Sequence, residues 1–428
     1  MPSEDISDQA NQPPLPPPDD SGGWMSGPLS PVAHVGEDGE PEAARLRGDM
    51  VAQLKASGAL HDVAVERAML TVPRHRFVPG HSLVEAYENV AITTSWEHGA
   101  PVSSVSQPEI IAVMLQQLRA APGMRVLEVG AGSGYNAALL AELVGPTGSV
   151  VSLEFDGELA ATAGARLAAA GYPQGQARVI AGDGWRGWPG GAPYDRIELT
   201  VGAMDLSLAW FEQLVEGGLL VAPLWLGATD VSVALRKRAG ALVSESWTLC
   251  GFVRLRGEGA EQATFARLSD RLSLTGPNAV ALAEPINALL ATRARRQWWG
   301  PHSESFIQYL ALASGRILSL WQANGRHRRR VRGRYLLYLE GPDGPSMVIF
   351  PNRAPALLSF GGTAAERFTH EQSEAYRQRG APPVERWRMV ARPLATDLLP
   401  PAPDVTRMTT EHWIYDISMG DQQTSGEP

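Results

Sequence analysis

The sequence predicts an α/β fold built on a parallel sheet, followed by a smaller unit of mixed α+β type. Between Pro122 and Leu226, strand-like and helix-like segments alternate at intervals that suit βαβ units. The first unit contains a glycine-rich turn at 130–134, between a short apolar run and an alanine-rich run. Beyond Val231 the alternation gives way to hairpin patterns, and later to a helix followed by further strands. These observations predict two structural units.

The first 122 residues predict a tail and then helices. Residues 1–40 are rich in proline, glycine and acidic side chains, so they cannot bury enough apolar surface to offset the entropy of ordering. We expect a disordered tail there. From 41 to 70, apolar residues recur three and four apart, which predicts two amphipathic helices. A loop-rich stretch then leads to a helix that begins near Pro108.

The parallel sheet is predicted by apolar segments that end at glycine or acidic residues. The expected strands are 126–129, 149–156, 177–184, 194–203 and 217–224. The segment 231–255 predicts β hairpins, which add antiparallel edge strands to the same sheet. We therefore expect the first structural unit to span residues 41–256.

Residues 257–428 predict a separate α+β extension. Its expected elements are a helical stretch at 278–297, a hairpin at 335–350 around a Pro-Asp-Gly turn, and a last strand at 412–418. We expect Trp298, Trp299 and the aromatic residues of the last strand in the core rather than on a ligand-binding surface.

Composition excludes several classes of protein. The chain has 428 residues, enough for two domains, and a formal charge of -9, which argues against a general nucleic-acid binder. No apolar run reaches the length of a membrane span, and the acidic, proline-rich start does not resemble a signal peptide, so we expect a cytoplasmic protein. The single cysteine, Cys250, is expected in a buried strand, and no metal-ligand spacing is present.

The glycine turn is typical of a ligand-binding loop. Gly130, Gly132 and Gly134 permit positive φ and close approach of a ligand to the first N–H groups of the next helix. A nucleoside triphosphate is excluded, because the turn lacks the Lys-Ser/Thr ending that neutralises phosphate. A dinucleotide remains open, since Gly132, Gly134 and Ala137 satisfy its permissive pattern.

Three acids follow successive predicted strands. Glu128, directly before the turn, would repel a pyrophosphate but suits the ammonium and sulfonium of S-adenosylmethionine. Glu154 is placed to accept from ribose hydroxyls of either cofactor, and Asp183 to accept from an adenine amino group. Each acid alone is typical of a solvated turn or a helix cap. Their order, together with the glycine turn, favours S-adenosylmethionine, with S-adenosylhomocysteine as the product.

Six collinear motifs between Ala43 and Arg256 resemble one known family. They are VPRHRFVP, AYENVAI, SSVSQPEIIAVML, PGMRVLEVGAGSGYNAALLA, GDGWRGWPGGAPYDRIELTVGA and QLVEGGLLVAPL. The chain resembles the protein-L-isoaspartate O-methyltransferases, and within them the branch found with the biosynthesis of ribosomal peptides (FxLD-type lanthipeptides and graspetides), whose members carry a C-terminal extension. The resemblance implies a class I S-adenosylmethionine-dependent methyltransferase fold: a seven-stranded, mostly parallel sheet with one antiparallel strand and helices on both faces.

The resemblance also implies roles for individual residues. Ser106 falls on the active-site serine beside the substrate carboxylate, and Thr200 lies where substrate and the methionine part of the cofactor meet. The expected cofactor-binding residues are Glu128, Gly130, Gly132, Gly134, Asn136, Glu154, Phe155, Asp183, Gly184 and Trp185. The expected substrate-binding residues are Ser104, Val105, Gln107, His98, Arg328 and Arg330. Asn89 departs from the family, which usually has an aspartate there.

Methylation of a carboxylate requires alignment more than acid–base catalysis, because the nucleophile is already anionic at neutral pH. The Ser106 hydroxyl can orient a carboxylate without neutralising it, and no lysine or arginine occurs between Val90 and Leu118. The alternative role of Ser106 is a cap of the helix that follows it, and the two roles can coexist.

The expected reaction is esterification of an aspartyl carboxylate, after which the next backbone amide closes a succinimide. The resemblance points to an aspartate of a macrocyclised ribosomal precursor peptide, giving aspartimide or isoaspartate; general repair of isoaspartyl proteins is the alternative. The extension favours a dedicated peptide, and the arginine run at 324–334 is expected to bind it or to form a solvated loop. A non-catalytic scaffold and an NAD-dependent oxidoreductase are weaker alternatives, because the cofactor acids are present and no hydride-transfer partner is evident.

Overall fold

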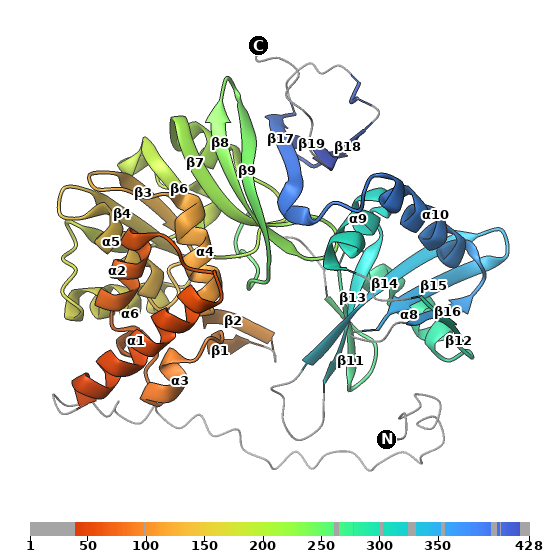
Figure 1. Ribbon diagram of the computed structural model, residues 1–428, viewed down its shortest axis with the longest axis horizontal. Helices are drawn as coiled ribbons and strands as arrows, with labels where there is room; N and C mark the ends of the chain where they lie inside the picture. The colour runs from red at the N-terminus through yellow and green to blue at the C-terminus, as the bar shows by residue number, and fades with distance from the viewer. Residues whose placement is uncertain are drawn as a thin grey trace.

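The computed structural model describes residues 39–97, 100–260, 265–276, 278–299, 303–323, 331–351, 356–394, 400–402 and 404–419. Figure 1 shows two lobes, a first built on a ten-stranded sheet and a second built on a seven-stranded sheet. All but the last two residues of the predicted tail at 1–40 lie outside the described residues.

The first lobe begins with the two predicted helices, α1 (Glu40–Ala56) and α2 (Val63–Thr71). α2 begins after Asp62, whose carboxylate accepts the backbone N–H groups of Ala64 and Val65. A 3-10 turn, η3 (Arg74–Phe77), and a short helix, α3 (Leu83–Tyr87), follow. A hairpin of β1 (Ile92–Glu97) and β2 (Ala100–Val105) then leads into α4 (Pro108–Leu118).

The main sheet of the first lobe confirms the predicted class I architecture. Its strands are β3 (Arg125–Val129), β4 (Ser149–Glu154), β5 (Ala177–Ala181), β6 (Tyr194–Leu199), β7 (Leu214–Trp225), β8 (Asp230–Arg238) and β9 (Ala241–Cys250). They lie in the order β5-β4-β3-β6-β7-β8-β9. The pairs among β3 to β7 are parallel and β8 is antiparallel to both its neighbours, so β8 is the one strand of opposite direction in this group.

Helices cover both faces of this sheet. α4, α5 (Tyr135–Val144) and α6 (Gly157–Ala169) pack on the face to which Val126 points, together with α1 and α2. α7 (Leu208–Gln213) packs on the opposite face, where Leu127 lies in the same buried cluster as Trp210. The two adjacent residues of β3 thus face two different cores, as expected for a strand covered on both sides.

The C-terminal strands correct the predicted boundary after residue 256. β17 (Trp387–Pro393) pairs with β9, and β19 (Trp413–Met419) and β18 (Val405–Thr409) extend the same sheet to ten strands. The predicted extension at 257–428 is therefore divided between two sheets. The aromatic strand at 412–418 belongs to the first lobe.

The second lobe is a fully antiparallel sheet in the order β10-β11-β13-β14-β15-β16-β12. The strands are β10 (Phe265–Arg267), β11 (Leu272–Thr275), β12 (Arg295–Trp298), β13 (Ile317–Ala323), β14 (Val331–Gly341), β15 (Gly344–Phe350) and β16 (Ala356–Gly361). α8 (Ala279–Leu290) packs on one face of it, and α9 (Glu304–Ser314) and α10 (Ala364–Gln378) pack on the other. The predicted hairpin at 335–350 is confirmed as β14 and β15.

Two predictions for the second lobe are wrong in detail. The helix expected at 278–297 ends at Leu290, and the residues after it form the edge strand β12. Trp298, expected in the core, is 80% exposed, because it lies at the end of this edge strand. Trp299 does pack inward, with its ring 4.7 Å from that of His370.

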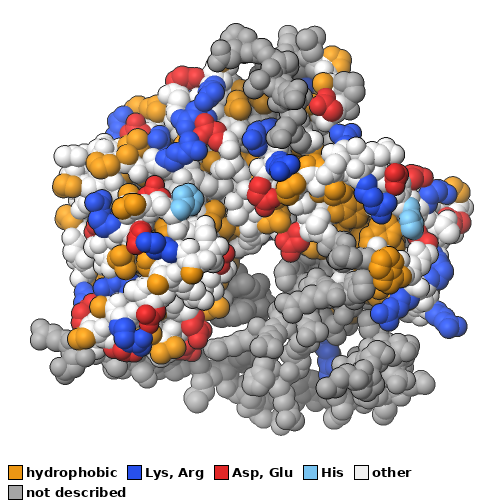
Figure 2. Space-filling view, in the orientation of Figure 1, with side chains coloured by type: hydrophobic (Ala, Val, Ile, Leu, Met, Phe, Trp, Pro, Cys, Tyr) orange, Lys and Arg blue, Asp and Glu red, His pale blue; other side chains and the backbone are white. Residues whose placement is uncertain are grey.

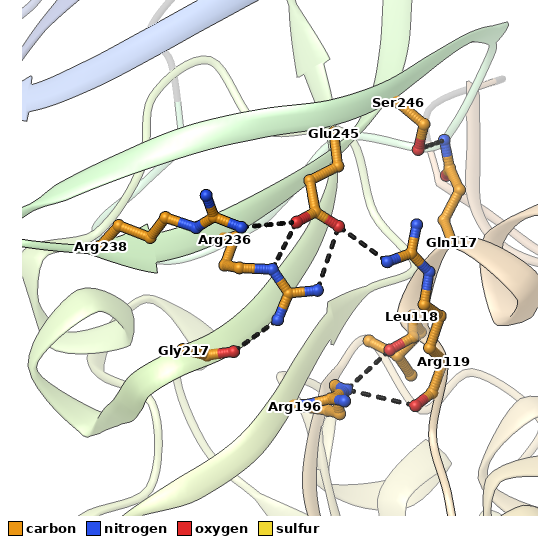
Figure 3. A network of polar contacts seen from close by, with 9 residues as sticks. All are labelled: Gln117, Leu118, Arg119, Arg196, Gly217, Arg236, Arg238, Glu245 and Ser246. Atoms are coloured by element: carbon orange, nitrogen blue, oxygen red, sulfur yellow. Dashed lines mark hydrogen bonds and ion pairs between the residues drawn. The ribbon is translucent and has the colours of Figure 1, made fainter. Parts of the chain in front are cut away.

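A polar network fixes the β8–β9 hairpin to α4 (Figure 3). Glu245 on β9 binds the guanidinium of Arg236 on β8, and its second oxygen lies 2.8 Å from Arg119, just after α4. Arg196 on β6 donates to the carbonyl of Leu118 at 2.8 Å. These contacts attach the C-terminal end of α4 to the sheet, and so fix the position of the helix that follows Ser106. Within the part of the chain that the structure describes, no helix is long and apolar enough to span a membrane.

Candidate functional site

The glycine turn lies against the end of β6. Gly130 has φ of 104°, and a Cβ there would come within 2.8 Å of Thr200 Oγ1, so both the conformation and the space require glycine. The Thr200 hydroxyl donates to the Gly130 carbonyl at 2.5 Å. Gly134, with φ of 92°, is the N-cap of α5 and packs against Ala163. Thr200 therefore holds the turn in place.

A first pocket of about 490 Å³ opens beside this turn. Its lining includes Val102, Ser103, Ser104, Val129, Gly130, Gly132, Leu153, Glu154, Phe155, Gly184, Thr200, Val201, Val253, Arg254, Leu255 and Arg256. The structure thus brings together half of the ten residues expected around the cofactor, namely Gly130, Gly132, Glu154, Phe155 and Gly184. A Cβ at Gly132 would project to 3.5 Å from the Ser104 carbonyl, so the missing side chain leaves room in this pocket for a ligand.

Glu154 is the main acid of the first pocket, as predicted. The residue as a whole is 6% exposed, and its Oε2 accepts the N–H of Gly132 at 2.9 Å. Its Oε1 lies 3.2 Å from Nη2 of Arg256, whose guanidinium stacks 5.3 Å from the Phe155 ring. The carboxylate is therefore held at the pocket wall, where ribose hydroxyls can donate to it.

Asp183 and Trp185 are placed differently from the prediction. Both oxygens of Asp183 accept backbone N–H groups, from Trp185 at 2.9 Å and from Glu258 at 2.8 Å. Asp183 caps the 3-10 turn η4 (Gly184–Arg186), and neither it nor Trp185 lines the pockets described here. The Trp185 ring packs edge-on against Trp210 at 5.3 Å. Of this predicted adenine-side group, only Gly184 faces the first pocket.

A second pocket of about 440 Å³ adjoins the first and shares Ser104, Gly130 and Thr200 with it. Its lining also includes Val105, Ser106, Ile111, Met114, Ala131, Ser133, Tyr135, Asn136, Glu198 and Phe252. The predicted substrate residues Ser104 and Val105 lie here with Ser106. The three shared residues mark the place where a group in one pocket meets a group in the other.

The Ser106 hydroxyl does not cap α4. The N-cap residue is Gln107, and the backbone N–H of Glu109 is satisfied by the amide oxygen of Asn89 at 3.0 Å. Asn89 also donates to the Glu109 carboxylate at 2.8 Å, which an aspartate could not do. Among the described residues Ser106 has no hydrogen-bond partner, so its hydroxyl is available to a ligand in the second pocket.

Gln107, another predicted substrate residue, lines neither pocket. Gln107 reaches only the Glu109 carboxylate, at 3.5 Å. His98, Arg328 and Arg330 lie outside the described residues, and their expected roles stay predictions.

Two buried acids lie beneath the second pocket. Glu128 on β3 and Glu198 on β6 are paired in register and are 0% and 1% exposed. Asn136 donates to both carboxylates at 2.9 Å, and the Ser152 hydroxyl donates to Glu128. Burial raises the pKa of Glu128 to about 7 and that of Glu198 to about 8. Glu198 was not predicted, although an acid inside the apolar run Ile197–Leu199 is a signal of a buried polar site.

The wall formed by residues 252–256 was also missed. This segment runs beside the loop after β6, with Gly202 donating to the Val253 carbonyl at 2.8 Å. It places Arg254 and Arg256 in the first pocket, and neither arginine was among the predicted site residues. Each is paired with an acid: Arg254 lies 2.5 Å from the buried Asp230, and Arg256 contacts Glu154. Because each guanidinium is already paired with an acid, it lowers the nucleophilicity of a nearby carboxylate less than a free cation would.

No group of three or more His, Cys, Asp or Glu side chains that could hold a metal ion occurs in the described residues. Cys250 ends β9, where burial raises the pKa of its thiol far above the ordinary value. A raised pKa leaves little thiolate, so this cysteine is a poor nucleophile.

Comparison with known proteins identifies the family. Residues 45–260 match the family model for protein-L-isoaspartate(D-aspartate) O-methyltransferase. The chain belongs to this family. It is 40% identical over 223 residues to the protein-L-isoaspartate O-methyltransferase of Methanopyrus kandleri, covering 50% of this chain and 92% of that one. It is 43% identical over 197 residues to the Aeropyrum pernix protein of the same name, covering 46% and 72%.

Solved structures that carry the same family name are also among the matches. A protein-L-isoaspartate O-methyltransferase structure covers 80% of this chain and 96% of its own, with a TM-score of 0.47 and 24% identity. A Plasmodium falciparum family member in complex with S-adenosyl-L-homocysteine covers 49% and 97%, with a TM-score of 0.43 and 22% identity. This methyltransferase is thus an S-adenosylmethionine-dependent carboxyl O-methyltransferase with an additional sheet-rich lobe.

Proposed function

We propose that this methyltransferase esterifies the side-chain carboxylate of an aspartate in a ribosomally made peptide that is already macrocyclised. The observation that carries the proposal is the meeting of the two pockets at Ser104, Gly130 and Thr200, with Ser106 on the substrate side, where its hydroxyl has no partner among the described residues. The first pocket suits the nucleoside part of the cofactor, because it combines the glycine turn with the fixed carboxylate of Glu154. The second is open to a carboxylate.

The residues of the chain serve mainly to orient the reactants. Bound S-adenosylmethionine supplies an electrophilic methyl group on a positively charged sulfur. Ser106 donates a hydrogen bond to the substrate carboxylate and leaves its charge in place, so that the oxygen stays nucleophilic. Thr200, by holding Gly130, fixes the boundary between the pockets. Apolar side chains such as Ile111, Met114 and Phe252 limit water around the reacting groups.

The methyl ester then reacts within the peptide. The backbone nitrogen of the following residue attacks the ester carbonyl, the new C–N bond forms as the C–O bond to methoxide breaks, and methanol leaves with the amide proton. The product is an aspartimide, which water opens to aspartate or isoaspartate. The enzyme therefore needs to catalyse only the formation of the ester, since the later steps take place within the peptide.

The second lobe supports a dedicated peptide substrate. Figure 2 shows a deep recess between the two lobes, and in Figure 1 the β1–β2 hairpin lies on the side of the first lobe that faces it. Ser103 and Ser104, which line the first pocket, belong to this hairpin. A folded peptide has more surface to recognise than a short damaged segment, so an extra lobe on this side favours a specific partner.

General repair of isoaspartyl residues is the second candidate. It is favoured by the 40% identity to the Methanopyrus kandleri protein, of which the match covers 92%. The second lobe lies outside the region matched by the family model, so the matched region is compatible with either substrate.

Mass spectrometry of two peptides separates the candidates. One is a candidate macrocyclised precursor and the other an unrelated linear isoaspartyl peptide, each incubated with enzyme and S-adenosylmethionine. Gain of one methyl group or loss of one water on the precursor alone supports the proposal. Efficient methylation of the isoaspartyl peptide, with no change in the precursor, supports repair and contradicts it.

A further inference from the structure

Three neighbouring strands place polar side chains in one row at the centre of the main sheet. Ser152 on β4 is paired in register with Glu128 on β3, and Glu128 with Glu198 on β6. All three are at most 1% exposed. Asn136, in the first turn of α5, lies over the row and donates to both carboxylates at 2.9 Å. The row ends at the second pocket, which Glu198 and Asn136 line.

The two carboxylates have no cationic partner among the described residues. Glu154 on β4 acts electrostatically on Glu128. Arg74 on η3 lies against Tyr135 of the second pocket, and Arg254 and Arg256 line the adjoining first pocket. Arg74 donates to the Ala86 carbonyl at 2.8 Å and lies over the Tyr135 ring at 5.1 Å. Arg254 and Arg256 bind Asp230 and Glu154.

Glu154 adds a further negative charge near Glu128. The Tyr135 hydroxyl, the other titratable group in this region, is neutral at physiological pH because burial raises its pKa to about 12. Two buried acids of the same sign, side by side and without a cation, cannot both stay ionised at neutral pH.

We propose that Glu128 and Glu198 share one proton in the ligand-free enzyme, and that they release it to solvent when the ammonium group of the cofactor's amino-acid part docks at Glu198, the member of the pair that lines the second pocket. The inference rests on the use of this site for the cofactor. It assigns to Glu198 a role in binding that cation. The side-chain amide of Asn136 donates to both carboxylates and keeps them oriented in both states.

The chemistry balances without any further reactant. Before binding, the pair carries one proton and one negative charge, and its Asn136 and Ser152 hydrogen bonds are made. The incoming ammonium brings one positive charge, which stabilises the second carboxylate in its ionised form, and the proton leaves to buffer. The raised pKa values of about 7 and about 8 place this exchange in the physiological range.

The test is isothermal titration calorimetry of the full chain with S-adenosylhomocysteine, which binds without turnover, in buffers of different ionisation enthalpy. We expect release of up to about one proton per site near neutral pH. We also expect affinity to rise by up to about tenfold per pH unit from about pH 6 to about pH 8. 5′-Methylthioadenosine, which lacks the amino-acid part, should bind with no proton released. Proton release with both ligands, or with neither, would overturn the proposal.

Two variants test whether the proton released on binding comes from the pair of buried acids. Glu198→Gln keeps an acceptor for Asn136 but removes one acid, so binding of S-adenosylhomocysteine should become weaker and lose its proton release. Glu142→Gln is the matched control, since Glu142 lies at the other end of α5 and bonds Tyr172 at 2.8 Å. Unchanged proton release in Glu198→Gln contradicts the proposal. If S-adenosylhomocysteine binds without proton release, only this inference fails; if it does not bind at all, the cofactor assignment fails too.

Discussion

Arg256 and Glu154 contact each other across the first pocket, with Arg256 Nη2 3.2 Å from Glu154 Oε1. The arginine side chain is 29% exposed and that of Glu154 only 7%, so the contact has an outer cation and an inner acid. We expect the ribose of the cofactor to donate to the inner acid. The two residues therefore differ in their expected effects on cofactor binding.

Glu154→Gln should weaken S-adenosylhomocysteine binding by about tenfold to a hundredfold, the equivalent of a charge-assisted hydrogen bond. Arg256→Gln should change it by about fivefold or less, because a partly exposed ion pair contributes little. Calorimetric titration of both variants measures the difference. A larger loss in Arg256→Gln than in Glu154→Gln would show that the arginine, and not the acid, holds the ligand.

Ser106→Ala should reduce kcat by roughly tenfold to a hundredfold, because the substrate carboxylate loses an orienting donor. The affinity for S-adenosylhomocysteine should stay unchanged, since the hydroxyl faces the second pocket. Ser57→Ala is the control: that serine follows α1, and its hydroxyl donates to the Leu54 carbonyl. Normal turnover in Ser106→Ala would remove this serine from the reaction.

Asn89→Asp should destabilise the fold by about 1 kcal/mol at neutral pH, since the new carboxylate faces that of Glu109 instead of donating to it. The second substitution Glu109→Gln should restore most of the loss by returning a donor to the pair. Denaturant unfolding of the wild type, both single variants and the double variant gives the coupling energy. Purely additive effects would contradict the pairing.

The ligand-free enzyme should become less stable as pH rises. Glu128 and Glu198 have folded pKa values of about 7 and about 8, above the ordinary value of 4.5, so the folded state binds protons that the unfolded chain releases. Their contribution to stability is complete below about pH 4.5 and is lost as pH passes through about 7 to 8. Thermal unfolding across this range should show a falling Tm, with a smaller slope in Glu198→Gln. An equal slope in both proteins contradicts the assignment.

The C-terminal strands should be required for the fold of the first lobe. Trp413 on β19 is fully buried and donates to the Leu206 carbonyl at 2.8 Å, in the loop that follows β6. Trp413→Ala should cost about 3–5 kcal/mol. Trp298→Ala, at an 80% exposed position, should cost less than about 0.5 kcal/mol. Equal stability of the two variants, measured by denaturant unfolding, would mean that β19 is dispensable.

Local patterns predicted the first lobe well because its signals lie close together in the chain. The strand, turn and helix around Gly130 are specified within about twenty residues, and a Cβ at that position would collide with Thr200. Glu154 was predictable for the same reason, since its place at the end of β4 follows from the strand pattern.

The parts that escaped prediction depend on contacts between distant segments. Arg256 reaches Glu154 only because its segment runs beside the loop after β6, and no local pattern encodes that pairing. β19 has the alternation of any half-buried strand, which does not say which sheet it joins. Asp183 was predicted from its position after a strand, but its two oxygens are used by the backbone of Trp185 and Glu258.

The most direct test of the account is a crystal structure of the enzyme with S-adenosylhomocysteine. We expect ribose hydroxyls on the Glu154 carboxylate and the sulfur at the junction formed by Ser104, Gly130 and Thr200, facing Ser106 in the second pocket. A ligand bound elsewhere, or one whose sulfur points away from Ser106, would contradict it.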